Sequence, residues 1–283
     1  MIKVLKHCRA ESGKRFKRGD IVSASEFSES QLQRFLHFRI VMVIEKDPLT
    51  PFIGEIRPVM VTGMWQRPEI FDIFGRHTSK LGIDVIVAGS EGETSRKQAE
   101  SFGFIYLEQP NQPLADKMNA TTIEAMKRGY THVICVGSDD LLSKELIDEY
   151  LRLIREGYHY IGVLDWYFFD TKTGKASYWG GYIDHRKGHT CGAGRVISSW
   201  LLNQWDGCPW EVKDSLYLDN SMQNKLSNCI KQEHTFSLKE KGLFAVDVKS
   251  STNMTPFELW PNSSYIDAEI ITSRFDVRNS SSN

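Results

Sequence analysis

The chain has 283 residues, of which 41% are hydrophobic and 25% are charged, and its formal net charge is -1. This is an ordinary globular composition, and the charge excludes a global attraction to DNA or to anionic lipid. The five cysteines are odd in number and form no CxxC pair, so neither a disulfide framework nor a zinc cluster is expected and a cytoplasmic location is favoured. We expect no signal peptide and no membrane span, because no apolar run approaches roughly 20 residues.

Residues 1–50 are expected to form a small α+β accessory domain. So small a unit buries little apolar surface and is expected to lean on its neighbour. Three prolines within residues 45–58 indicate a linker. The expected elements are strands at 4–5, 20–22 and 40–44 and a helix over 25–38, with Ser28 or Ser30 as its N-cap.

Residues 51–283 are expected to form an α/β catalytic domain. From Pro58 strands and helices alternate, which predicts a mostly parallel sheet covered on both faces. The regularity fades after about residue 158. Strands are expected at 59–62, 83–88, 104–107, 131–136, 160–170 and 243–248, and helices at 68–81, 95–102, 114–128, 143–156, 196–205 and from about 219.

Two adjacent carboxylates, Asp139 and Asp140, follow the buried strand at 131–136. Ligands of open α/β sheets bind at the carboxyl ends of the strands, and paired carboxylates there attract a hard divalent cation that can hold a diphosphate. The alternative is that both residues only cap the next helix. The preceding strand–helix alternation favours a site for Mn²⁺ or Mg²⁺.

Residues 58 to about 250 resemble a GT-A-fold glycosyltransferase, close in layout to family 2. The resemblance lies in the strand leading to Arg67-Pro68, in the stretch 116–120 that precedes the metal loop, and in Gly137-Ser138-Asp139-Asp140 at the family's DxD region. It implies a Rossmann-like nucleotide-diphospho-sugar transferase domain. Gly137 stands where many members carry the first aspartate, which leaves Asp139 as the metal ligand and Asp140 as its support or as a sugar contact.

The resemblance also implies which residues bind the donor. Many relatives read the nucleobase or ribose with an acidic residue after the second strand, where this chain has Ser90 and Glu91, so the nucleotide is in doubt and a UDP-sugar is favoured. Ordinary turn or surface roles remain the alternatives for Ser90, Gly194 and Lys249. The implied donor-binding residues are Thr62, Arg67, Ser90, Glu91, Lys117, Asn119, Ser138, Asp140, Gly194 and Lys249.

Asp219 matches the acidic motif that supplies the general base in inverting relatives. That chemistry needs one carboxylate within about 3 Å of the acceptor hydroxyl, whereas the alternative role is a helix N-cap. His189 is a candidate for an additional metal or diphosphate contact, and a surface histidine is the alternative.

The expected function is therefore metal-dependent, inverting transfer of a sugar from a nucleoside diphosphate sugar to an acceptor hydroxyl. Residues 1–50 also resemble small accessory domains of bacteriophage proteins, which suggests a phage enzyme working in the host cytoplasm. The acceptor would then be a modified base in DNA, with a virion protein or a surface glycan as alternatives. Two other classes stay open, a nucleotidyltransferase of similar layout and a non-catalytic sugar-nucleotide-binding protein.

Overall fold

A computed structural model describes residues 2–22, 24–38, 40–43, 52–211, 218–227, 229, 231–253, 257 and 261–277. Its centre is a seven-stranded sheet in which β14 alone runs against its neighbours. The sheet is therefore mostly parallel, as the strand–helix alternation predicted. In spatial order its strands are β15 (Glu233–Phe236), β11 (Tyr160–Val163), β14 (Arg195–Ser198), β9 (His132–Cys135), β6 (Pro58–Gly63), β7 (Asp84–Gly89) and β8 (Ile105–Glu108).

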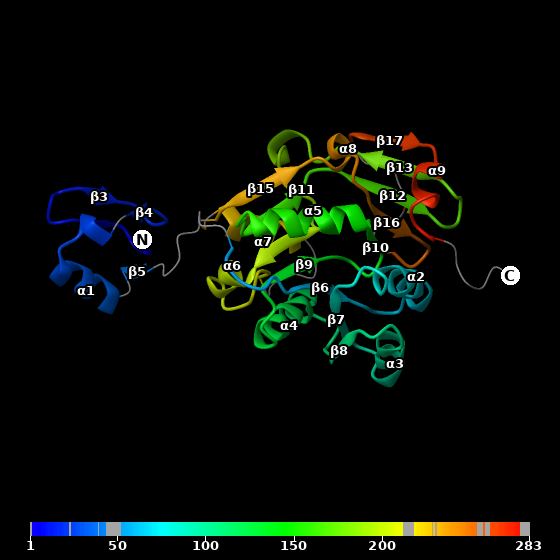
Figure 1. Cartoon of the computed structure of the whole chain (residues 1–283), viewed down its shortest axis with the longest axis horizontal. Helices are drawn as coiled ribbons and strands as arrows, with labels where there is room; N and C mark the ends of the chain where they lie inside the picture. The colour runs from blue at the N-terminus through cyan, green and yellow to red at the C-terminus, as the bar shows by residue number, and fades with distance from the viewer. Residues whose placement is uncertain are drawn as a thin grey trace.

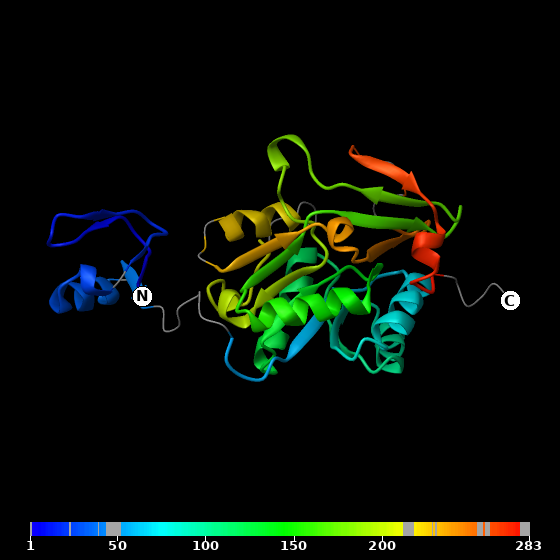
Figure 2. The same cartoon turned by 45° about the horizontal axis from the view of Figure 1, so that its top comes forward.

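Helices cover both faces of this sheet (Figures 1 and 2). Side chains alternate between the faces of a strand, and in β6 Met60 belongs to one hydrophobic cluster while Val59 and Val61 belong to the other. Because both faces are apolar, β6 lies at the centre of the domain. The Met60 side carries α2 (Pro68–Thr78), α3 (Glu93–Ser101) and α5 (Lys144–Arg155), and the other carries α4 (Leu114–Lys127), α6 (Ser199–Asn203) and α7 (Leu218–Ser227).

A second, five-stranded sheet packs into the Met60 cluster. Only β12 and β16 pair in parallel, and the other three pairs are antiparallel. Its strands are β10 (Asp140–Leu142), β16 (Ala245–Lys249), β12 (Trp166–Asp170), β13 (Ala176–Trp179) and β17 (Ser263–Ile266), and the short helices of this half are η2 (Asp184–Arg186), α8 (Leu238–Lys241) and α9 (Glu269–Thr272).

The N-terminal elements have a hydrophobic cluster of their own, which includes Ile2, Val4, Phe16, Phe27 and Phe35. Figure 1 shows them apart from the larger body. They comprise β1 (Ile2–Val4), β2 (Cys8–Arg9), β3 (Arg15–Phe16), β4 (Ile21–Val22), η1 (Ala24–Glu26), α1 (Glu29–His37) and β5 (Val41–Val43), with Ser28 capping α1 through Gln31 N.

Two predicted elements are wrong. The single strand expected over 160–170 is two strands, β11 and β12, which belong to different sheets. The helix expected over 196–205 begins only at Ser199, because the apolar residues Val196 and Ile197 pair with β9 as part of β14. Ser198 ends that strand and accepts a hydrogen bond from Leu201 N, so it caps α6.

Candidate functional site

A cavity of about 370 Å³ opens at the carboxyl ends of β6 and β9. This is where the topology of an open α/β sheet places ligands. One wall carries the predicted metal loop with Asp139 and Asp140, and Asp219 lines the cavity as well. The predicted metal-binding residues and the predicted general base therefore line the same cavity. Among the candidate residues, the cavity is lined by Arg67, Ser138, Asp139, Asp140, Asp219 and Lys249.

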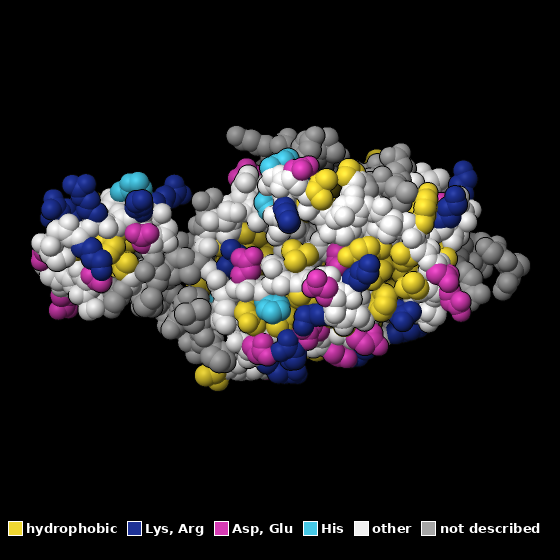
Figure 3. All heavy atoms as spheres, turned by 90° about the horizontal axis from the view of Figure 1, so that it is seen from above, with side chains coloured by type: hydrophobic (Ala, Val, Ile, Leu, Met, Phe, Trp, Pro, Cys, Tyr) yellow, Lys and Arg dark blue, Asp and Glu magenta, His cyan; other side chains and the backbone are white. Residues whose placement is uncertain are grey.

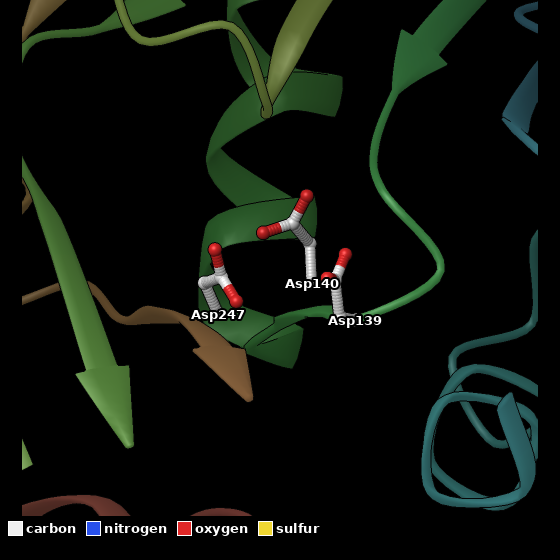
Figure 4. Close-up of side chains that lie close together, drawn as sticks. All are labelled: Asp139, Asp140 and Asp247. Atoms are coloured by element: carbon white, nitrogen blue, oxygen red, sulfur yellow. The ribbon is translucent and has the colours of Figure 1, made fainter. Parts of the chain in front are cut away.

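The metal loop meets a third carboxylate that the sequence analysis missed. Strands β10 and β16 are antiparallel, and their register sets Asp140 directly opposite Asp247. Val248 N donates to Asp139 O at 2.8 Å, which fastens the loop to β16. Carboxylate oxygens of Asp139, Asp140 and Asp247 lie within 4.8 Å of one another (Figure 4).

The three carboxylates of this cluster repel one another. Burial, then repulsion by Asp247 and Asp139, raises the pKa of Asp140 well above its usual range. Burial, then repulsion by Asp139, raises the pKa of Asp247 to about 7, although Lys249 opposes the shift. Like charges opposite one another in an antiparallel pair are destabilising. The cluster therefore favours binding of positive charge.

Two cations and an amide already contact the aspartates. Arg67 Nη1 lies 2.6 Å from Asp139 Oδ2, and Asn253 Nδ2 donates to the same oxygen at 2.7 Å. Lys249 Nζ lies 2.6 Å from Asp247 Oδ2. Burial opposes the charged form of Lys249, but the nearby charges of Asp247 and Asp139 outweigh it and raise the pKa of Lys249. Arg67 and Lys249 thus orient the carboxylates and also bring positive charge to the cavity.

The oxygen ligands that the three aspartates offer fit a hard divalent cation. Asp247 Oδ1 is buried and has no hydrogen-bond partner among the described residues, so one ligand oxygen is left for an ion. Carboxylate oxygens are the ligands that Mg²⁺ and Mn²⁺ prefer. A Cβ at Gly137 would approach Asp139 Oδ1 to 2.4 Å and Asp140 Oδ2 to 2.9 Å. Glycine fits at position 137 because these two carboxylates occupy the space that a side chain would need, and Asp247 brings a third carboxylate to the cluster.

Asp219 lies in the first turn of α7, one residue after the helix begins. Its carboxylate presses against the Gly192 backbone, since a Cβ at Gly192 would meet Asp219 Oδ1 at 2.0 Å. Arg195, which is buried, has its Nη1 3.5 Å from Asp219 O and holds Thr190 O at 3.0 Å through Nη2. The arginine therefore ties the start of α7 to the glycine-containing segment that precedes β14.

Lys117, Ser90 and Glu91 form a second polar group beyond the carboxyl end of β7. Lys117 Nζ donates to Ser90 Oγ at 2.6 Å and to Met64 O at 2.7 Å. Burial lowers the pKa of Lys117 to about 8 against the opposing fields of Glu91 and Glu108. Glu91 accepts hydrogen bonds from Gln66 N at 3.2 Å. The group fixes the loop that carries Arg67.

The remaining predicted residues hold the scaffold around the cavity. Asn119 exchanges two hydrogen bonds with the backbone of Trp210, which lines the cavity. Gly194 has φ +77 and packs against Trp166 and Tyr150, so a side chain there would collide with both. Thr62 is fully buried, and its hydroxyl has no partner among the described residues.

His189 lies outside the cluster of three aspartates. Its ring centre is 6.5 Å from that of Tyr182, which lines the cavity. Burial, then the charges of Arg186, Arg195 and His185, lowers the pKa of His189.

Comparison with solved structures supports the architecture. The chain superposes on S. aureus TarS residues 1–349 with a TM-score of 0.51 and 12% identity, covering 68% of this chain and 60% of that one. For a longer TarS chain the TM-score is 0.50 and the identity 12%, and the match covers 69% of this chain and 37% of TarS. The chain therefore spans less than two thirds of the length of either TarS structure. A candidate nucleotide-diphospho-sugar transferase of Desulfovibrio desulfuricans G20 gives 0.41 and 10%, with 65% and 81% covered.

The likeness to TarS, read with the sheet order, shows a fold of the GT-A, nucleotide-diphospho-sugar transferase type. No family model and no curated protein sequence matches the chain. Every helix in the described part of the chain is too short or too polar to cross a bilayer.

Proposed function

We propose that this chain is a metal-dependent glycosyltransferase that uses a nucleoside diphosphate sugar. The observation that carries the proposal is the shared cavity, which is lined both by the cluster of three aspartates and by Asp219. We call the part of the lining that holds the three aspartates the donor wall and the part that holds Asp219 the acceptor wall. Transfer to a hydroxyl needs both parts, because the leaving diphosphate must be stabilised and the acceptor must lose a proton.

On the donor wall, Asp139, Asp140 and Asp247 would hold Mn²⁺ or Mg²⁺. The cation supplies charge that offsets the departing diphosphate. Arg67 and Lys249 line the same wall and would contact phosphate oxygens, since each is a cation beside the proposed ion site. A UDP-sugar is the donor proposed, with Ser90, Glu91 and Lys117 at the carboxyl end of β7 as candidates for the nucleobase side.

On the acceptor wall, Asp219 would take the proton from the acceptor hydroxyl as its oxygen attacks the anomeric carbon. The nucleoside diphosphate leaves from the opposite side, so the configuration inverts. Gly192 leaves room for the Asp219 carboxylate, and buried Arg195 tethers the backbone of α7 near it. A general base of this kind contributes about 10²–10⁴-fold to turnover.

The proposed setting is a reducing cytoplasm, which the five free cysteines favour. We also propose that the protein comes from a phage. Its acceptor would be a modified DNA base, a virion protein or a surface glycan.

The deciding experiment is a donor screen that measures nucleoside diphosphate release with Mn²⁺ and with a chelator. We expect release from one class of nucleotide sugar and its loss on chelation. Release of pyrophosphate from a nucleoside triphosphate and a sugar phosphate would instead identify a nucleotidyltransferase. Tight nucleotide binding without release, and without any effect of changing Asp219, would identify a binding protein.

A further inference from the structure

The segment between β13 and β14 carries an arginine whose hydrogen-bonding edge has no partner among the described residues. Arg186 ends η2, and its guanidinium carbon lies 3.5 Å from the centre of the Tyr182 ring. Arg186 Nε and Nη2 are buried and have no hydrogen-bond partner in the described part of the chain. Nε and Nη2 are the two nitrogens of the guanidinium fork that binds two oxygens of one phosphate or carboxylate group.

The fork lies next to the acceptor wall of the cavity, because Arg186 stacks on Tyr182, which lines that cavity. Tyr182 lines the cavity together with Asp219. Burial, then the nearby Asp219 carboxylate, raises the pKa of Tyr182 to about 12, while Arg186 opposes the shift. One aromatic ring therefore connects the unpaired fork to the wall that holds the proposed base. The cations that contact the three aspartates are Arg67 and Lys249, so the Arg186 fork is not one of the proposed diphosphate contacts.

The segment that carries Arg186 is mostly basic. Neighbouring His185, Lys187 and His189 are basic, and Asp184 is the one acidic residue of the segment 183–189. No ion pair within the described residues involves Arg186. His189 Nδ1 is likewise buried without a hydrogen-bond partner there. A buried donor left without a partner is rare, and an unpaired guanidinium is a typical binding site for an oxyanion.

We propose that the Arg186 fork binds a phosphodiester group of the acceptor, beside the hydroxyl that receives the sugar. The inference rests on the proposed function and names its acceptor class, a phosphodiester-linked polymer. A polymer fits better than a single carboxylate because further cations are exposed. Lys187 is exposed next to the fork, and the N-terminal unit presents lysine and arginine side chains at its surface (Figure 3). Those cations are Lys6, Arg9, Lys14, Arg15, Lys17 and Arg18.

The first test needs no donor and no turnover. The NMR signal of Arg186 Nε–H is followed while dimethyl phosphate, a phosphodiester monoanion, is titrated into the full chain. We expect a saturable downfield shift of that signal, and no saturation with neutral trimethyl phosphate. Arg186→Lys serves to assign the signal. Lys172→Gln, which removes an exposed charge from the turn between β12 and β13, should leave the titration unchanged. Absence of a saturable shift in a folded wild-type protein would overturn the proposal.

The second test divides acceptor binding from turnover. In Arg186→Gln we expect the KM for a phosphodiester acceptor to rise roughly 10- to 100-fold, which corresponds to loss of a charge-assisted hydrogen bond. The kcat and the donor affinity should stay within about twofold, and Arg186→Lys should recover part of the loss because it keeps the charge. An unchanged acceptor KM in Arg186→Gln would overturn the assignment.

The acceptors for this test are a hydroxymethylated oligonucleotide and a polyol phosphate polymer, with a neutral glycan as the comparison. Whichever phosphodiester polymer accepts sugar identifies the source, and transfer to the neutral glycan alone would contradict the acceptor class. If wild-type protein releases no nucleoside diphosphate but still binds dimethyl phosphate through Arg186, the proposed function fails while the anion site stands.

Discussion

The two walls of the cavity are built differently. On the donor wall, protein partners contact the carboxylates of Asp139, Asp140 and Asp247, and one oxygen of Asp247 is left over. Next to the acceptor wall, Arg186 stacks on the cavity-lining Tyr182 and has two buried nitrogens without partners among the described residues. We infer that side chains of the donor wall are held in place by partners within the protein, whereas the arginine beside the acceptor wall gains its hydrogen-bond partners only from a bound ligand. Charges fixed in place are appropriate for binding a metal ion and a diphosphate. Hydrogen-bond donors without protein partners are appropriate for binding an acceptor that can vary.

The largest effect is expected on the acceptor wall, at the proposed base. Asp219→Asn should reduce turnover by about 10²–10⁴-fold at saturating donor while the affinity for nucleoside diphosphate with Mn²⁺ stays unchanged. Asp206→Asn, an exposed change in the turn after α6, is the matched control. Steady-state kinetics and calorimetry on the same samples provide the comparison. Normal turnover in a stable Asp219→Asn protein would place the base elsewhere.

On the donor wall, Asp247→Asn should weaken Mn²⁺-dependent nucleotide binding by at least about 10–100-fold, the range that applies to residues supporting a metal. The same change should alter the melting temperature of the metal-free protein little, because relief of repulsion within the cluster of three aspartates offsets the loss of the ion pair with Lys249. A purely structural Asp247 would show the opposite pattern, with a lower melting temperature and unchanged binding. Exposed Asp148→Asn is the control for both measurements.

The response to pH should also come from the donor wall. The folded chain keeps a proton on Asp247, whose pKa is raised to about 7, at pH values where the unfolded chain has lost it near 3.8. The folded state therefore binds more protons in that interval, and this group makes the metal-free protein less stable as pH rises from about 4 to 7. A metal competes with that proton.

Mn²⁺ affinity should accordingly increase up to about tenfold per pH unit below pH 7 and level off above it. Thermal unfolding between pH 5 and 8, with and without Mn²⁺, tests this sign. A Mn²⁺-induced rise in melting temperature that is equal at pH 5.5 and pH 8 would contradict it.

The sequence predicted the first half of the catalytic domain closely. The alternating strands and helices expected over 58–156 all form, and only the short strand β10 was not foreseen. Ser143 caps α5 as predicted by accepting from Leu146 N. These elements depend on local spacing, which a sequence shows directly. The second half was less predictable because β12 and β16 pair across a long separation in a second sheet.

The same reason explains which site residues were missed. Asp139 and Asp140 are adjacent and follow a buried strand, whereas Asp247 reaches them only through the register of β10 with β16. A signal was present, since Asp247 and Lys249 alternate on one strand and point to the same side. The lack of hydrogen-bond partners at Arg186 Nε and Nη2 could not be predicted, because it depends on which residues the tertiary structure brings near Arg186.

The smallest effect is expected from the N-terminal unit. Both walls of the cavity are formed by residues between 63 and 253, and the N-terminal unit has a hydrophobic cluster of its own that runs from Ile2 to Val41. Removal of residues 1–51 should therefore leave Mn²⁺-dependent release of nucleoside diphosphate within about twofold, provided that thermal unfolding shows a cooperative transition. The KM for a phosphodiester acceptor should rise more than this, and the rise should shrink with added salt, because the deletion removes exposed cations. A folded truncation that no longer binds donor would mean that the two units act as one domain. An acceptor KM that does not change would confine acceptor recognition to the wall that holds Arg186 and Asp219.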